Sequence, residues 1–204
     1  MAARMLPARI VSGLLHPLLL PLYMIAALLC GRTGYAALYP LRIKCYLSWS
    51  VVLFTVLVPA LSLALLRSYR KIGDLELSRR SDRIVPLALM TLCYTLCALA
   101  VVRVPGAHAL SRFVFCGAGC AAFCLAVSCF WKISLHLTGM GTVSAILFWI
   151  GAAGGDTVWP LALALTGAGA LAAARLQLGY HTPAQVACGF AAGAAIASCI
   201  ILFV

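Results

Sequence analysis

Seven long apolar runs separated by short polar breaks constrain the fold of this chain more than any other feature. The runs cover approximately residues 10–30, 46–66, 84–102, 111–131, 137–153, 157–174 and 184–204. A membrane-spanning helix needs about 20 apolar residues, and the bilayer offers no water to satisfy an exposed backbone. The runs therefore predict an all-α, polytopic membrane helix bundle of six to seven spans.

Composition agrees with this fold class. The chain is 65% hydrophobic and 9% charged, whereas a soluble domain carries roughly 25% charged residues. The breaks are short, so we expect a single integral membrane domain over residues 1–204. The first run contains His16-Pro17 and Pro21, so it either kinks or enters and returns, which leaves the count at six or seven. Its apolar part is too long for a cleavable signal peptide.

The ten cysteines and the net charge of +11 each have an ordinary explanation in a membrane bundle. Cys116, Cys120 and Cys124 recur at four-residue spacing without any Cys-x-x-Cys, which indicates a packing face of one helix. Gly189-x-x-x-Gly193 is interpreted in the same way, as is Gly151-x-x-x-Gly155. The cations lie in the breaks, where they act as topology signals and suit anionic lipid headgroups. No nucleic-acid partner is expected.

Three of the breaks carry groups suited to phosphate chemistry. One holds Arg175 and His181, a second holds Lys132 with Ser134 and His136, and the third is the charged loop 67–83. Two spans separate consecutive breaks, so all three fall on one face of the bundle. Cations neutralise a phosphate, and imidazoles are competent nucleophiles and proton donors near neutral pH. The other two histidines are interpreted as a loop residue (His108) and a structural residue (His16).

At these residues the chain resembles the type 2 phosphatidic-acid phosphatase superfamily, which includes lipid phosphatases and vanadium haloperoxidases. The family's third block reads Ser-Arg, five residues, His, three residues, Asp. Here Ala174-Arg175, five residues, His181, three residues, Gln185 stands in that register. The resemblance covers approximately residues 79–204, where we expect a phosphatase-like core.

The other two blocks of the family match in part. The second usually reads Pro-Ser-Gly-His, and here it reads Ile133-Ser134-Leu135-His136. The first usually reads Lys, six residues, Arg-Pro, and here it is reduced to Arg79-Arg80-x-x-Arg83-x-x-Pro86. The family commonly has its first two blocks in one loop, whereas two spans separate them in this chain.

The resemblance implies a mechanism for the matching positions. His181 would attack phosphorus and form a phosphohistidine, and His136 would protonate the leaving oxygen. The phosphate-binding groups would be Arg175, Arg83, Arg80 and Ser134, and Lys132 is an alternative phosphate-binding cation that could replace the one missing from the first block. Gln185, in place of the family's Asp, would orient His181 without supplying a negative charge, so weaker activation is expected. This chemistry requires no metal and no other cofactor.

Three functions follow from these observations. The first is hydrolysis of a lipid-linked phosphate or pyrophosphate, with membrane lipid as the surroundings and the lipid phosphate as the substrate. The second is a degenerate member that binds lipid phosphate or has a structural role, which Gln185 and the weak first block favour. The third is a small transporter, which is disfavoured because no charged residue is placed at the middle of a span.

The orientation depends on the first run. If all seven runs span, Arg4 and Arg9 favour an inside N-terminus and a cytoplasmic site. If the first run returns on one side, six spans remain and the site faces outward. We expect an integral protein of the bacterial inner membrane with its site on the periplasmic face.

Overall fold

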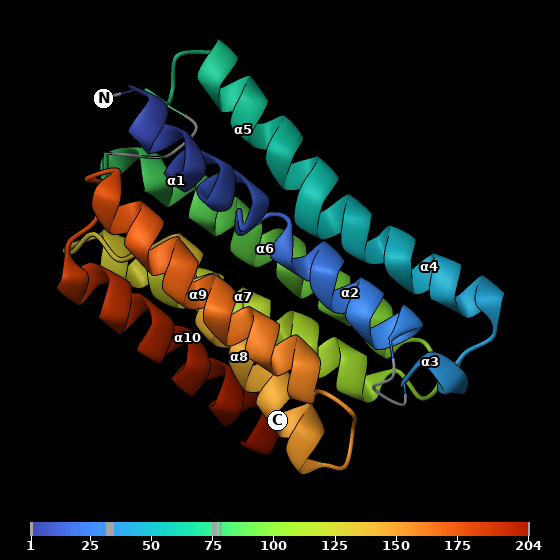
Figure 1. The fold of residues 1–204 in the computed structure, drawn as a ribbon. Coiled ribbons are helices and arrows are strands. Elements are labelled where there is room, and N and C mark those ends of the chain that lie inside the picture. Colours follow the sequence, from blue (N-terminus) through green and yellow to red (C-terminus); the bar gives the residue numbers. More distant parts are fainter. Residues whose placement is uncertain (1, 32–34, 75–76, 78, 204) are drawn as a thin grey trace.

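A computed structural model of the chain describes residues 2–31, 35–74, 77 and 79–203, and the described part is helical without any strand (Figure 1). The short N-terminal helices are α1 (Ala2–Leu14), α2 (Leu20–Cys30) and α3 (Tyr35–Leu38). They are followed by α4 (Leu41–Val51), the π-helical segment η1 (Val52–Leu57), α5 (Val58–Ser68), the single 3-10 turn η2 (Ser81–Arg83), α6 (Ile84–Val102), α7 (His108–Ser128), α8 (Leu135–Ala152), α9 (Val158–Gln177) and α10 (Pro183–Phe203).

Six of these helical segments are long and apolar enough to cross a membrane. They cover Leu41–Ser68, Ser81–Val102, His108–Ser128, Leu135–Ala152, Val158–Gln177 and Pro183–Phe203. The first of them joins α4, η1 and α5 into one continuous helix. The all-α membrane bundle expected from the apolar runs is therefore confirmed at this level.

The first apolar run is interrupted, as its prolines predict. Proline lacks the backbone N–H that a helix interior needs, and helix α1 ends at Leu14, shortly before Pro17. Pro21 instead occupies the first turn of α2, where that N–H is not required. The two short helices follow one another in the same direction between the two ends of the bundle (Figure 1), with His16 in the break between them.

Helices α8 and α10 pack closely because glycines remove the side chains between them. A methyl group at Gly193 would collide with the backbone oxygen of Thr138, and one at Gly189 would lie 2.8 Å from the backbone oxygen of Ser134. The interpretation of Gly189 and Gly193 as a packing face is therefore confirmed. Gly155 instead lies beyond the end of α8 in a turn, so the second glycine pair is not a helix face.

The cysteines of α7 line a packing face as expected. Cys116, Cys120 and Cys124 are buried. The thiols of Cys116 and Cys120 point at backbone oxygens of α10, at 3.7 and 3.9 Å. All ten cysteines are free thiols.

Candidate functional site

One cavity of about 170 Å³ lies inside the bundle between α2, the continuous α4–η1–α5 helix, α6, α7 and α8. The charged and imidazole side chains that line it are His16, Arg83, His136, Arg175 and His181. They come from the break before α2, the start of α6, the first turn of α8, the last turn of α9 and the break before α10. All of these places belong to the same end of the bundle. The structure therefore brings together the break that holds His136, the break that holds Arg175 and His181, and Arg83, which is the last residue of loop 67–83.

The segment between α9 and α10 places Arg175 and His181 through two standard helix ends. Gly179 has φ +68°, and the N–H groups of Gly179 and Tyr180 donate to the carbonyls of Leu176 and Arg175, at 3.0 and 3.2 Å. This pattern is a Schellman motif, which needs a left-handed residue and therefore favours glycine. It ends α9 at Gln177, two residues after Arg175, and turns the chain back toward the bundle.

The start of α10 is a capping box. The hydroxyl of Thr182 accepts from the Gln185 N–H at 3.4 Å, and Oε1 of Gln185 accepts from the Thr182 N–H at 3.2 Å. Pro183 follows as the first residue of α10, where its missing N–H has no cost. The box fixes the side chain of Gln185 beside the ring of His181.

Gln185 determines the protonation pattern of His181. Its Oε1 lies 2.9 Å from Nδ1 of His181, and the same oxygen already accepts the Thr182 N–H. An amide oxygen only accepts, so Nδ1 of His181 donates and carries the proton of the neutral ring. Nε2 is then the nitrogen with the lone pair.

The surroundings keep His181 neutral. Burial lowers its pKa to about 4, although the bond to Gln185 opposes this shift. The nearby cations Arg175, Arg83 and Lys132 lower the pKa further. An imidazole of this kind is uncharged at neutral pH and is available as a base or a nucleophile.

Arg175 is held rigidly at the end of α9. Its side chain is 2% exposed, and the guanidinium carbon lies 4.5 Å from the ring centroid of Tyr180. Stacking on an aromatic face is a favourable geometry for guanidinium. Tyr180, which follows the αL glycine, therefore orients the arginine.

His136 and His16 form the other imidazole pair of the cavity. Their rings meet edge to face with centroids 5.2 Å apart, and Nδ1 of His16 accepts from the Leu18 N–H at 3.3 Å. His136 is 6% exposed, and among the described residues none hydrogen-bonds to its Nε2. A buried polar atom in this state indicates room for a bound group or a water molecule.

Arg83 enters the cavity as the expected cation from loop 67–83. Its Nε donates to the backbone oxygen of Leu77 and its Nη1 donates to that of Ile133, both at 2.8 Å. These bonds connect the start of α6 to the break before α8 and use only part of the donor capacity of a guanidinium. Leu77 has φ +52°, a sparsely populated region for leucine, and residues 75, 76 and 78 of this loop lie outside the described residues.

The remaining expected residues lie outside the cavity lining. Arg80 is exposed, and its Nη1 donates to the backbone oxygen of Phe130 at 2.6 Å. Ser134 is fully buried as the N-cap of α8, where its hydroxyl accepts from the Leu137 N–H at 3.5 Å. The expected phosphate-binding role of Arg80 and Ser134 therefore has no support from their positions.

Lys132 lies at the edge of the charged group. Its side chain is half-buried. Burial lowers its pKa, and repulsion from Arg83 and Arg175 adds to this effect, while Asp74 opposes it. These interactions place Lys132 close to both arginines, although it does not line the cavity.

His16 lines the cavity, although its place within the first apolar run predicts a structural residue. The available signal was a histidine followed by proline in a break of an apolar run, since ionisable residues at membrane depth are functional candidates by default.

The assembled group suits an anion with tetrahedral oxygens. Two buried guanidiniums flank imidazoles, one of which presents an unprotonated Nε2. Among the described residues no three His, Cys, Asp or Glu side chains are grouped so that they could hold a metal ion. The described part of the site therefore offers cations and imidazoles rather than a metal-ligand set.

Comparisons with protein-family models, with curated proteins and with solved structures give no match for this chain.

Proposed function

We propose that the chain is a membrane phosphatase that hydrolyses a lipid-linked phosphate or pyrophosphate through a phosphohistidine intermediate. The observation that carries this proposal is the convergence of Arg83, Arg175, His136 and His181 at one end of a cavity that is otherwise largely apolar. A phosphate headgroup suits the charged end, and a hydrocarbon chain suits the rest. We also propose that the chain is a divergent member of the type 2 phosphatidic-acid phosphatase superfamily, whose motifs it resembles.

The first step assigns the nucleophile. Nε2 of His181 attacks phosphorus, the P–O bond to the lipid breaks, and the ring becomes cationic while Nδ1 keeps its bond to Gln185. Arg83 and Arg175 hold the phosphoryl oxygens, where guanidiniums stabilise the charge that spreads over them. His136 gives a proton to the leaving oxygen.

The second step returns the enzyme to its starting state. A water molecule attacks phosphorus and gives its proton to His136, the bond between phosphorus and Nε2 of His181 breaks, and inorganic phosphate leaves with the His181 ring neutral again. Nε2 of His136 is the atom open to both proton transfers, because no described residue forms a hydrogen bond to it.

Phosphate release from a panel of lipid phosphates tests this proposal. His181→Ala should abolish release, and His136→Ala should slow it by roughly 10²–10⁴-fold through loss of the general acid. His108→Ala is a matched control, because this histidine does not line the cavity. A radiolabelled lipid phosphate should leave an acid-labile label on the wild-type chain and none on His181→Ala.

Gln185 favours a second candidate function, the binding of lipid phosphate without turnover. A neutral amide beside His181 supplies no charge for the cation that forms on attack. Gln185→Asp tests this difference, since a carboxylate there should raise or establish activity. If neither the wild type nor a folded Gln185→Asp variant releases phosphate from any lipid phosphate, the binding function replaces the enzymatic one.

The orientation of the site is part of the proposal. The expectation of a periplasmic site requires a first run that returns on one side, whereas α1 and α2 continue in one direction (Figure 1). With seven passages the site end carries the larger share of Lys and Arg, and the positive-inside rule favours the cytoplasm. In a variant that keeps Cys129 and has Ser at the other exposed cysteines, Cys30, Cys45, Cys188 and Cys199, a membrane-impermeant maleimide should then label Cys129 only in opened cells. Labelling of Cys129 in intact cells would restore the periplasmic expectation.

A further inference from the structure

We infer that the cavity is a shaft for a single long hydrocarbon chain, so that the lipid phosphate taken by this site has one tail and is selected by the length of that tail. This inference rests on the proposed function for the identity of the headgroup. The shaft itself is a separate feature, because most of its lining belongs to the interior of the bundle and not to the charged end.

The lining follows α6 over almost its full length. Arg83 stands directly before α6, and the cavity is then lined by Leu87, Met90, Tyr94 and Val101 of one helix face. At a rise of about 1.5 Å per residue, Arg83 and Val101 are about 27 Å apart along the helix. This length approaches the hydrocarbon thickness of a bilayer, about 30 Å, and exceeds the depth of one leaflet.

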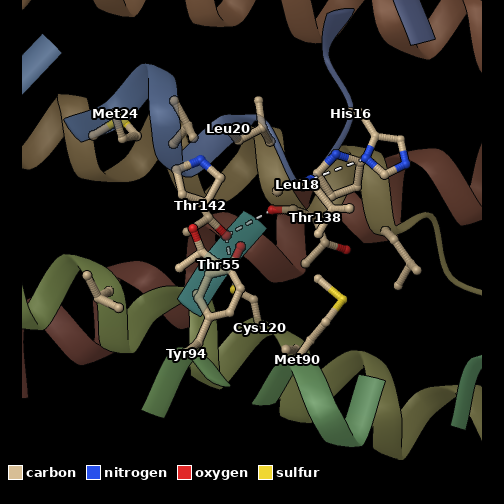
Figure 2. Close-up of a pocket in the computed structure, with 18 of the residues that line it drawn as sticks. His16, Leu18, Leu20, Met24, Thr55, Met90, Tyr94, Cys120, Thr138 and Thr142 are labelled. Atoms are coloured by element: carbon tan, nitrogen blue, oxygen red, sulfur yellow. Dashed lines mark hydrogen bonds between the residues drawn. The ribbon is translucent and has the colours of Figure 1, made fainter. Parts of the chain in front are cut away.

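Helices α2 and α7 also line the cavity from the charged end to the far end. Near the charged end the lining includes Leu20 of α2 and Cys124 of α7, and at the far end it includes Leu28 of α2 and Leu110 of α7. Figure 2 shows α2 residues Leu20 and Met24 on one side of the pocket, and α6 residues Met90 and Tyr94 on the other. The hydrocarbon of an occupant would therefore lie between protein helices and not in the surrounding lipid.

The threonine hydroxyls along the shaft are satisfied by backbone oxygens of the protein. The hydroxyls of Thr138 and Thr142 donate to the backbone oxygens of Ser134 and Thr138, at 3.0 and 2.9 Å. The hydroxyl of Thr55 donates to the Val51 oxygen at 2.7 Å. These threonines leave little demand for a polar ligand group, so the shaft suits hydrocarbon.

The width of the shaft accommodates one chain. The centre of a water-sized sphere can reach about 170 Å³ of the cavity, which over this length is a track about one sphere wide. Such a track suits one chain and not two acyl chains side by side. Two glycines of the lining face larger residues at close range. A methyl group at Gly139 would lie 2.7 Å from Leu20, and one at Gly117 would collide with the ring of Tyr94. Tyr94 follows Arg83 by eleven residues, about 16 Å along the helix.

Binding to purified full-length protein in detergent tests the inference without requiring turnover. The probes are geranyl phosphate, whose chain ends before Tyr94, geranylgeranyl phosphate, whose chain extends past it, octadecyl phosphate and dioleoyl phosphatidic acid. The wild type should bind geranylgeranyl phosphate at least tenfold more tightly than geranyl phosphate and than phosphatidic acid. Octadecyl phosphate distinguishes the two kinds of chain: tight binding means that the shaft takes straight and methyl-branched chains alike, and weak binding assigns it to isoprenoid chains.

Blocking the shaft at a known depth should remove the preference for the longer chain. Gly117→Leu pushes the Tyr94 ring into the passage, so geranylgeranyl phosphate should fall to the affinity of geranyl phosphate, which itself changes by less than about threefold. Gly169→Leu is the matched control, since nothing lies within 4 Å of a methyl group at that position. Tyr94→Trp enlarges the side chain at the same depth and replaces Gly117→Leu if that variant does not fold.

Several results would overturn the inference: equal binding of both prenyl phosphates by the wild type, phosphatidic acid binding as tightly as geranylgeranyl phosphate, or an unchanged preference in the folded blocking variants. Chain-length preference without phosphate release would support the shaft and refute the phosphatase. Phosphate release from all probes without any preference would support the phosphatase and refute the shaft.

Discussion

The substitution Gln185→Glu tests how the protein controls its candidate nucleophile. Glu has the shape of Gln, and it suits the third position of a capping box near a helix N-terminus, where negative charge is favourable. The hydrogen bond from the Thr182 N–H can therefore be kept. The change adds a carboxylate where the amide oxygen now lies 2.9 Å from Nδ1 of His181.

The expected size of the effect follows from this contact. A carboxylate at such a distance favours the charged form of its partner by about 1–3 pKa units, so the pKa of His181 should rise from about 4 to between about 5 and 7. One unit corresponds to about 1.36 kcal/mol. If all of this stabilisation is present in the transition state, where the ring becomes cationic, phosphate release rises by about 10–1000-fold.

The pH dependence has a defined sign. The pKa of His181 in the folded chain lies below its ordinary value of about 6.5, so its neutral form adds stability above that value. This stability is lost as the pH falls from about 6.5 toward about 4. In Gln185→Glu the loss of stability at low pH should be smaller, because the protonated ring of His181 gains a carboxylate as its partner.

Nuclear magnetic resonance of histidine labelled with ¹³C at Cε1 measures these midpoints directly. The chain has four histidines, so the resonance of His181 can be assigned by its absence in His181→Gln. Gln185→Leu, which offers no acceptor to Nδ1, is the control for loss of the bond. A wild-type midpoint near the ordinary value, or an unchanged midpoint in Gln185→Glu, would refute the electrostatic argument. A raised midpoint without faster phosphate release would show that the missing charge does not limit turnover.

Three further predictions concern the surroundings of His181. Arg83→Ala should lower the free energy of unfolding by about 2–5 kcal/mol, because two backbone oxygens lose charged donors in a buried site. Arg83→Lys should recover part of this stability and little of the phosphate binding. Denaturant unfolding measures the stability, and phosphate titration measures the binding. His16→Ala should slow phosphate release by up to about 100-fold, because His136 loses the ring that meets it edge to face and orients it; unchanged release would contradict this role for His16. Gly193→Ala should destabilise the fold by about 1–3 kcal/mol through overpacking against α8, while Gly169→Ala should have almost no effect in the same thermal-unfolding measurement.

The sequence alone determined the class of fold and the local geometry of the best-defined motif. Runs of about 20 apolar residues leave a helix as the available structure in a bilayer, and the described residues contain six helices long and apolar enough to cross one. Gly179, Thr182, Pro183 and Gln185 specify a helix end and a helix start by local hydrogen bonding, so their roles depend on near neighbours in the chain. The shared face of the three breaks also followed from counting spans.

Only the tertiary structure decided which groups meet. Arg80 and Arg83 are three residues apart, which is close to one helical turn, yet one donates to Phe130 at the exposed edge and the other enters the cavity. His16 joins the site because the break before α2 lies against the first turn of α8, a contact between residues 120 positions apart in the chain. The shaft depends on side chains from α2, the α4–η1–α5 helix, α6, α7 and α8, and on glycines that face some of them. Contacts of this kind arise from packing between distant segments, and hydrophobic periodicity along one segment carries no record of them.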